Sequence, residues 1–288
     1  AGSLLKVALC RYVAEGAWPS SPSKPTTPVR SLPDWHHYRV LGFSSVAGVR
    51  GSWSGAVGAV TKEAYHRTTG YLQWFLGYRN KGGEWQRLMP PTRTFWADPF
   101  PVTHQAVQYL FFEQYRYARG LGELMVSTWS EEGWSAPSVV LSEAWHLSYP
   151  NVFEHNGEHY MLPEMASAGR VDLYVADQFP NSWRVLATLI PEIEAVDPTL
   201  HFQDGVWWLF VSTSLHDGGS ADLLLFFATT IAGPYSPHPQ NPISRDCRVA
   251  RPAGHLFRDE GALIRPAQDC AVRYGRGVVF QEVSVLTT

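Results

Sequence analysis

The sequence predicts an all-β protein, a five-bladed β-propeller. The first observation is a degenerate repeat that opens at Trp96-Ala97-Asp98-Pro99-Phe100. Its later copies contain Pro150, Pro198 and Pro252, so successive prolines lie about fifty residues apart. The second observation is that each copy runs into a short apolar strand, a turn and a second strand rich in aromatic or branched residues. A repeat of this length, built from short strands, is typical of a propeller.

Each unit is expected to supply one blade, and Gly-containing turns separate the first two strands in the last three units. The turns are Asn156-Gly157, Asp204-Gly205 and Glu260-Gly261. The strands expected in the first two units are 97–102, 107–115, 123–128, 138–141, 151–154, 158–162, 171–175 and 183–189. Those expected in the last two are 199–202, 206–211, 222–228, 254–257, 262–266 and 277–283.

The fifth blade is expected from the two ends of the repeat region. The aromatic segment 71–78 and the tail after Glu282 are left over once the four units are assigned. N- and C-terminal strands joined in one further blade close the ring and remove exposed sheet edges. The propeller is therefore assigned to 71–288. Residues 1–70, with a Pro/Ser/Thr-rich run at 19–33, are expected to be an irregular extension that caps the ring or supplies a closing strand.

Composition excludes several classes of partner. The net charge is -3, charged residues make up 17% of the chain, and no basic stripe is present, which argues against nucleic acid. No apolar run reaches the roughly 18 residues that span a bilayer. The three cysteines have neither metal-type spacing nor the pattern of a disulfide scaffold, which slightly favours a cytoplasmic location. The composition does not indicate an oligomeric state.

Polar residues recur where the repeat units begin. Asp98, Asn151, Asp197 and Arg251 lie at or near the starts of the innermost strands, which line the central channel of a propeller. Different blades should therefore aim polar groups at one funnel. Glycosidic bond cleavage uses such convergence, because it needs a carboxylic acid and a second carboxylate on one site.

Two glutamates occupy equivalent strand positions in neighbouring units. Glu164 ends an apolar strand in Leu162-Pro163-Glu164, where a carboxylate is costly unless it is used or paired. It is the candidate general acid. Glu113, in Phe112-Glu113-Gln114, stands at the same point of the preceding unit and is a further candidate.

Several motifs together resemble one family. They are Phe95-Trp96-Ala97-Asp98-Pro99-Phe100, Phe111-Phe112-Glu113, His146-Leu147-Ser148-Tyr149-Pro150, Met161-Leu162-Pro163-Glu164, Ala195-Val196-Asp197-Pro198-Thr199-Leu200, Trp207-Trp208-Leu209-Phe210, Arg251-Pro252-Ala253-Gly254 and Arg265-Pro266-Ala267-Gln268-Asp269 with Tyr274-Gly275. They resemble the propeller at the N-terminus of plant glucosamine inositolphosphorylceramide transferases and its bacterial relatives, over about residues 71–285. That propeller is similar in turn to the five-bladed arabinanase/levansucrase-type glycoside hydrolases.

The resemblance implies a link to glycans and roles for two aspartates. Asp98 resembles the base or nucleophile of the arabinanase-type enzymes, and Asp197 resembles the aspartate that tunes their acid. The sequence departs from that pattern in the position of the general acid along the chain. Those enzymes place it after both aspartates, whereas Glu164 lies between them.

Further polar and aromatic residues are predicted to bind the ligand. Two arginines near a channel can hold a carboxylate, a phosphate or sugar hydroxyls in a bidentate manner. The alternative is an Arg–Asp pair that only fixes one blade against the next. The predicted binding set is Trp96, Glu113, His146, Tyr149, Asn151, Arg251, Arg265, Gln268 and Asp269.

No metal and no cofactor are predicted. His155 and His159 lie four residues apart, but across a turn rather than on one helix face, so they do not form a metal motif. The Gly-rich segments do not stand between a strand and a helix, as a phosphate loop does.

The leading functional hypothesis is a glycan-active enzyme of glycoside-hydrolase type that acts on a carbohydrate or glycoconjugate. The alternative is a non-catalytic module that binds a glycan or a nucleotide sugar for a glycosyltransferase. A third reading is an interaction scaffold whose polar channel is only a hydrated axis.

Overall fold

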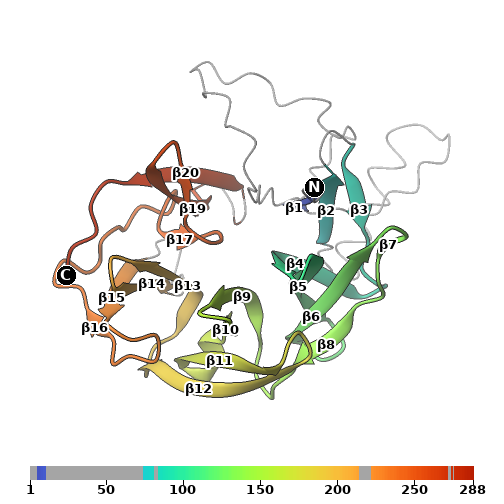
Figure 1. Cartoon of the computed structure of the whole chain (residues 1–288), viewed down its shortest axis with the longest axis horizontal. Coiled ribbons are helices and arrows are strands. Elements are labelled where there is room, and N and C mark those ends of the chain that lie inside the picture. The colour runs from blue at the N-terminus through green and yellow to red at the C-terminus, as the bar shows by residue number, and fades with distance from the viewer. Residues whose placement is uncertain (1–4, 11–73, 81–83, 214–221, 272–273, 275) are drawn as a thin grey trace.

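The computed structural model describes residues 5–10, 74–80, 84–213, 222–271, 274 and 276–288. The chain is an all-β protein in which successive sheets follow one another around a common centre (Figure 1). This propeller-like arrangement confirms the predicted fold class. In the described part of the chain, no helix is long and apolar enough to cross a membrane.

Four sheets of four or five strands form the blades. The first contains β4 (Thr94–His104), β5 (Val107–Arg116), β6 (Leu121–Ser130), β7 (Gly133–Trp134) and β8 (Ser138–Leu141), and the second β9 (Ser148–His155), β10 (Glu158–Glu164), β11 (Arg170–Gln178) and β12 (Ser182–Pro191). The 3-10 helix η1 (Ala166–Ala168) connects β10 to β11. The third contains β13 (Ala195–Gln203), β14 (Val206–Thr213), β15 (Leu223–Ala228) and β16 (Ser236–Pro237), and the fourth β17 (Arg251–Pro252), β18 (Phe257–Asp259), β19 (Ala262–Asp269) and β20 (Gly277–Val283).

The structure shows four blades rather than the predicted five, and the predicted ring closure is not shown. The C-terminal strand β20 pairs with β19 inside the fourth blade, from Asp269↔Gly277 to Leu263↔Val283. Residues 284–288 form no further strand that could join one from the N-terminus. A separate three-stranded sheet joins β1 (Leu5–Cys10), β2 (Phe75–Asn80) and β3 (Gln86–Leu88) in that order. The rest of the predicted extension, residues 1–4 and 11–70, lies outside the described residues.

The first hairpin of each blade turns on two residues with positive φ. Such a pair is the mark of a type I′ turn, which matches the twist of the flanking strands. The pairs are Gln105-Ala106, Asn156-Gly157, Asp204-Gly205 and Glu260-Gly261. Three of the four contain the glycine that predicted them. The first contains none, so only its backbone shows that it belongs to the same set.

The repeat prolines lie inside strands, not before them. Asp98, Tyr149 and Asp197 each precede a proline and have φ of 49°, 46° and 49°. The pairing register shifts at each of these points, which is a β-bulge. A bulge bends the strand and re-aims a side chain, and positive φ at a non-Gly residue is a strained state found often at functional sites. The bulges therefore turn these three side chains toward the centre.

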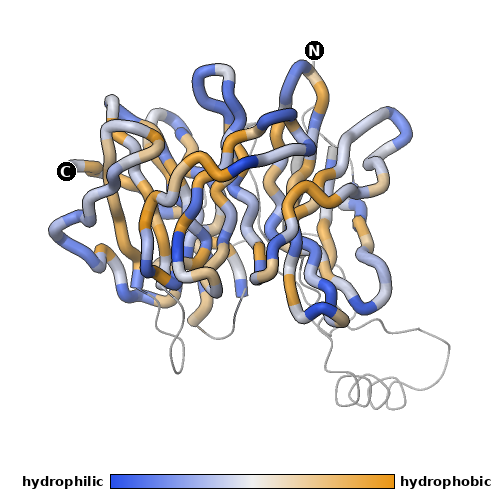
Figure 2. Tube along the Cα trace, turned by 90° about the horizontal axis from the view of Figure 1, so that it is seen from below, coloured by the Kyte–Doolittle hydropathy of each residue, from blue (hydrophilic) through white to orange (hydrophobic). Residues whose placement is uncertain are grey.

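The hydrophobic core lies between neighbouring sheets. Phe111 and Leu124 of the first blade pack with Val152 and Met161 of the second. Comparable clusters join the second blade to the third, the third to the fourth, and the first blade to the sheet that contains β2. Figure 2 shows hydrophobic positions along the strands and hydrophilic ones at many of the turns. Face-to-face packing of this kind accounts for most of the aromatic residues.

Candidate functional site

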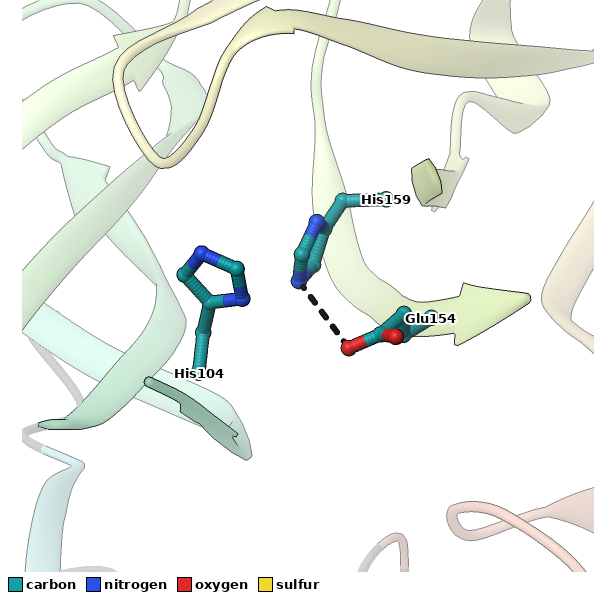
Figure 3. Close-up of side chains that lie close together, drawn as sticks. All are labelled: His104, Glu154 and His159. Atoms are coloured by element: carbon teal, nitrogen blue, oxygen red, sulfur yellow. Dashed lines mark ion pairs between the residues drawn. The ribbon is translucent and has the colours of Figure 1, made fainter. Parts of the chain in front are cut away.

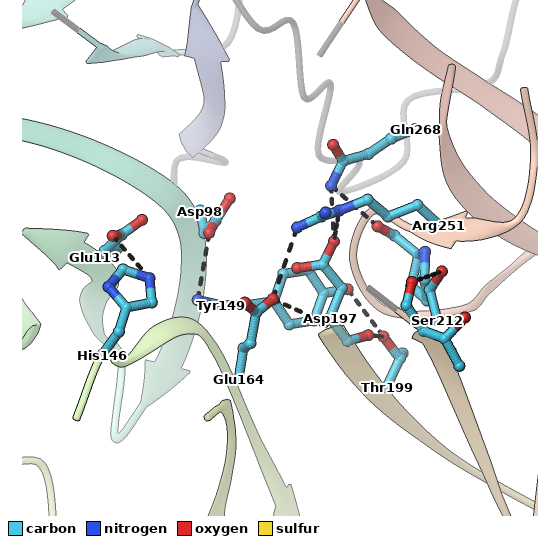
Figure 4. A network of polar contacts seen from close by, with 12 residues as sticks. Asp98, Glu113, His146, Tyr149, Glu164, Asp197, Thr199, Ser212, Arg251 and Gln268 are labelled. Atoms are coloured by element: carbon cyan, nitrogen blue, oxygen red, sulfur yellow. Dashed lines mark hydrogen bonds and ion pairs between the residues drawn. The ribbon is translucent and has the colours of Figure 1, made fainter. Parts of the chain in front are cut away.

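One set of side chains at the centre comes from the residue before each repeat proline. The bulges of β4, β9 and β13 and the start of β17 present these residues to one another (Figure 4). They are Asp98, Tyr149, Asp197 and Arg251.

A second set comes from the neighbouring strand of each blade. Strand pairing places one polar residue beside each repeat start, and this confirms that Glu113 and Glu164 are equivalent. The pairs are Ala97 with Glu113, Ser148 with Glu164, Val196 with Ser212, and Arg251 with Gln268. Each blade thus supplies two central positions, and four of the eight residues are carboxylic acids.

Five of these eight residues line a pocket of about 190 Å³. Its polar lining is Asp98, Glu113, His146, Ser148, Glu164, Arg251 and Gln268. Aromatic rings form much of the remaining wall, from Trp74, Phe95, Tyr115 and Tyr274. The sequence therefore identified most of the polar lining, and the convergence it predicted from different blades is present.

Arg251 pairs with two acids at the base of this site. Its Nε donates to Oδ2 of Asp197, and its Nη2 lies 3.6 Å from Oε2 of Glu164. Gln268 Nε2 donates to the same Asp197 oxygen at 2.9 Å, and the Arg251 guanidinium lies 5.0 Å from the Tyr274 ring centroid. The Asp197 side chain is 1% exposed. One arginine thus neutralises only part of the negative charge that the site can carry.

Burial and crowding of like charges raise the pKa of these acids. Burial raises the pKa of Asp98 to about 7, and the nearby Asp197 adds to the shift while Arg251 and the Tyr149 N–H oppose it. Burial raises the pKa of Glu113 well above its ordinary value, and the charges of Asp98 and Glu164 add to it. Burial also raises the pKa of Asp197 against the opposing charge of Arg251. These shifts favour the protonated forms of Glu113 and Asp98, which a proton donor requires.

Glu113 faces an oriented histidine. The Gly122 N–H donates to His146 Nδ1 at 2.9 Å, so a neutral ring carries its proton on Nε2, and burial lowers the pKa of His146. That Nε2 lies 3.6 Å from Glu113 Oε1. A Cβ on Gly122 would lie 2.3 Å from the Leu147 carbonyl oxygen and 2.7 Å from Glu113 Oε1. Only glycine therefore allows this approach of Glu113 and His146.

Tyr149 links its own blade, the second, to the other three blades at the centre. Its hydroxyl accepts a hydrogen bond from the Gly254 N–H at 2.6 Å and shares another with Thr199 Oγ1 at 2.9 Å. Its backbone N–H donates to Asp98 Oδ2 at 3.3 Å. These bonds join the second blade to the first, third and fourth. Tyr149 therefore fixes the relative positions of the other central residues.

Two predicted binding residues lie in contacts between or within blades. Trp96 Nε1 donates to Gln114 Oε1 at 3.0 Å, and its ring packs on Phe112 in the core. Successive residues of a strand point to opposite faces, so the side chains of Trp96 and Ala97 lie on opposite faces of the sheet. Asn151 Nδ2 donates to the Pro198 carbonyl at 3.3 Å, between the second and third blades.

Two more predicted binding residues hold the fourth blade together. Arg265 donates to the carbonyl of Val249 and to Gln281, and burial lowers its pKa to about 10. Asp269 pairs with Arg276 at 2.6 Å. Neither residue lines the central pocket. Arg265 therefore has a structural role in the fourth blade, but without the Arg–Asp pair between blades that was the alternative, whereas Arg251 lines the pocket.

Several residues of the site escaped the sequence analysis. Ser212 does not line the pocket, but it stands in the third blade at the place that Glu113 and Glu164 hold in the first two, so the register of the repeat is its only signal. Trp74 and Tyr115 lie outside the quoted motifs, whereas Phe95 and Tyr274 lie within them but were not among the predicted site residues. No local pattern sets them apart from the many aromatic residues of the core.

The raised pKa of Asp98 predicts that stability falls as pH rises. An aspartate titrates near about 4 when unfolded, whereas Asp98 in the folded state titrates at about 7. The folded state therefore holds the proton between these values, and its advantage is lost as pH rises through about 7. Urea unfolding from pH 5 to pH 8 should show a free energy of unfolding that declines, with Asp98 responsible for on the order of 2 kcal/mol.

Asp98→Asn should flatten this decline, whereas Asp177→Asn, at a surface carboxylate 47% exposed, should leave it unchanged. A free energy that rises with pH over this range, or an equal slope in Asp98→Asn, would contradict the assignment.

Two comparisons of sequence bear on this site. A family model described as glucosamine inositolphosphorylceramide transferase 1, N-terminal, matches residues 88–288. A protein of that name from Oryza sativa subsp. japonica is 39% identical over 199 residues, and the match covers 67% of this chain and 27% of the relative. The protein of the same name from Arabidopsis thaliana is 33% identical over 227 residues, which cover 73% and 30%. The chain thus spans less than a third of the curated relatives that it matches.

Solved structures share the fold at low sequence identity. An exo-β-1,3-galactanase from Phanerochaete chrysosporium matches with a TM-score of 0.56 and 13% identity, over 76% of this chain and 55% of that one. An α-L-arabinanase from Cellvibrio cellulosa matches with a TM-score of 0.51 and 14% identity, over 73% and 84%. At this identity the likeness concerns the fold. The family match covers the repeat and the central site, and the chain belongs to the family of N-terminal domains of glucosamine inositolphosphorylceramide transferase 1.

Proposed function

We propose that this chain is a glycan-active enzyme of glycoside-hydrolase type that acts in its central pocket. One observation carries the proposal. Asp98, with a pKa raised to about 7, and Glu113, whose pKa burial raises well above its ordinary value, come from one blade and line the same pocket. Glycoside hydrolysis needs a carboxylic acid that gives up a proton and a carboxylate that acts as base or nucleophile.

The pocket lining supports a sugar as the ligand. Flat rings of Trp74, Tyr115 and Tyr274 offer apolar surfaces to a sugar face, and carboxylates with Gln268 offer partners for hydroxyl groups. The volume of about 190 Å³ is below that of sites for drug-sized molecules. We therefore expect one sugar unit of a larger glycan or glycoconjugate in the pocket.

The roles follow from the contacts of each acid. Asp98 is the base or nucleophile. Glu164, the acid expected from the sequence, accepts the Asp197 N–H at 3.0 Å and pairs with Arg251 at 3.6 Å, so it is already engaged by two partners. Glu113 is the better candidate acid, because its pKa is raised and no hydrogen-bond donor contacts its Oε1 within the described residues. Asp197 raises the pKa of both Asp98 and Glu113, which is the modulating role.

The test is a screen of oligosaccharides and aryl glycosides of both anomers with the parent chain and Asp98→Asn. We expect turnover of at least one substrate by the parent and a loss of about 10²–10⁴-fold in Asp98→Asn, the range for a positioned acid or base. Asp177→Asn, at an exposed carboxylate, is the matched control. Turnover that survives in Asp98→Asn would remove Asp98 from the chemistry.

The family match supports a second candidate, a non-catalytic module that binds a glycan or nucleotide sugar. The relatives are named as transferases, and this chain corresponds to less than a third of their length. The same screen separates the two candidates. Saturable binding that persists in Asp98→Asn, without turnover by the parent, would favour the module.

A further inference from the structure

Three potential metal ligands meet between the first two blades, outside the central pocket. His104 ends β4, while Glu154 and His159 flank the turn between β9 and β10 (Figure 3). Their ligand atoms all lie within 4.8 Å of one another. The Nε2 atom of His159 lies 3.7 Å from Oε2 of Glu154, which is beyond hydrogen-bond distance. The two histidine rings stand edge to face, with centroids 4.6 Å apart.

His159 is buried with its ring nitrogen unsatisfied. Its side chain is 5% exposed, and Nε2 has no hydrogen-bond partner within the described residues. The ring stacks on Phe179 with the centroids 3.9 Å apart, which fixes its orientation. A buried polar atom without a partner is costly, and one of the few explanations for it is an ion that the site binds.

We propose that His104, Glu154 and His159 bind one divalent transition metal ion of the zinc type. Two imidazole nitrogens and a carboxylate oxygen are donors that zinc takes, at about 2.0–2.2 Å. Tetrahedral coordination at that length places donor atoms about 3.3–3.5 Å apart, close to the 3.7 Å between His159 and Glu154. The Glu154 side chain is 50% exposed, so it has room to rotate toward the ion. Three protein ligands leave one position for water.

The site joins two blades at their turn ends. His104 precedes the type I′ turn of the first blade, and the other two ligands flank the corresponding turn of the second. A bound ion would therefore tie the two hairpins together at the end of their interface. An ordinary ion pair is a weaker account, because the 3.7 Å between His159 Nε2 and Glu154 Oε2 is too long for a hydrogen bond.

The proposed ligand set differs from the pair His155 and His159, which stands out in the sequence. His155 is four residues from His159, but its ring packs on Phe202 and Trp207 of the third blade, at centroid distances of 5.1 and 4.7 Å. The third ligand instead comes from His104 in another repeat. His155 is therefore the matched control for a surface histidine that happens to be nearby.

The test is a titration of the metal-free, tag-free chain with ZnCl₂ by calorimetry, and with CoCl₂ by visible absorption. We expect one ion per chain and the intense bands of four-coordinate Co²⁺. His104→Ala and Glu154→Gln should each weaken binding by more than about tenfold, a loss that outer-shell partners of a metal already cause. His155→Ala should bind as the parent does. Since Glu154 is exposed, Glu154→Gln decides the matter if a histidine variant does not fold.

Three results would overturn the proposal. They are an absence of stoichiometric binding by the folded parent, equal affinity in His104→Ala and Glu154→Gln, and a loss in His155→Ala as large as that in His104→Ala. None of the three ligands lines the central pocket, so the outcome does not depend on whether the chain cleaves glycans.

Discussion

Glu113→Gln should lower turnover of substrates with poor leaving groups by about 10²–10⁴-fold, the usual contribution of a general acid. The glutamine keeps the shape of the side chain but replaces the carboxyl group by an amide, which cannot act as a general acid. The loss should shrink for aryl glycosides with strongly acidic phenols, because such leaving groups depart without protonation. Measuring kcat for a series of aryl glycosides, with substrates taken from the screen, checks this directly.

Glu164→Gln is the matched comparison, because Glu164 holds the equivalent position in the second blade. If Glu113 is the acid, the dependence on the leaving group should steepen in Glu113→Gln and stay close to that of the parent in Glu164→Gln. The reverse pattern would return the acid role to Glu164, as the sequence alone suggested. Similar slopes in both variants would exclude either as the acid.

Arg251→Met should lower the free energy of unfolding by about 3–5 kcal/mol at pH 8, as expected when one partner of a buried charge pair is removed. Arg251 contacts Asp197 and Glu164, whose side chains are 1% and 10% exposed. Without the guanidinium both acids remain buried beside each other. The loss should be smaller at pH 5, because the raised pKa of Asp197 lets it accept a proton. Urea unfolding at the two pH values measures both effects.

Arg248→Met is the control for this change. Arg248 lies three residues away and pairs with Asp246 at 2.6 Å, but its side chain is 66% exposed. Its replacement should leave the unfolding midpoint nearly unchanged, since exposed pairs contribute little. Arg251→Lys, which keeps the charge but not the planar fork, should fall between parent and Arg251→Met. An Arg251→Met midpoint equal to that of Arg248→Met would show that the central acids do not need this arginine.

The fold was predictable to the extent that it depends on local patterns. Asn156-Gly157 and Asp204-Gly205 predicted turns that the structure contains. The blade count was not predictable in this way. It depends on whether the residues that follow β20 form a further strand beside the N-terminal segment, and residues 284–288 form none.

The sequence by itself determined that a proline-marked repeat brings acidic residues to equivalent places, because strand periodicity and turn chemistry act over a few neighbouring residues. Only the tertiary structure decided how those residues are used. The bulges at Asp98 and Asp197 aim both side chains at the centre, and Arg251 reaches Asp197 from another blade. In the same way, His159 meets His104 rather than His155. Such contacts join residues about fifty positions apart, and they depend on strand register and side-chain direction, which no local pattern of residues specifies.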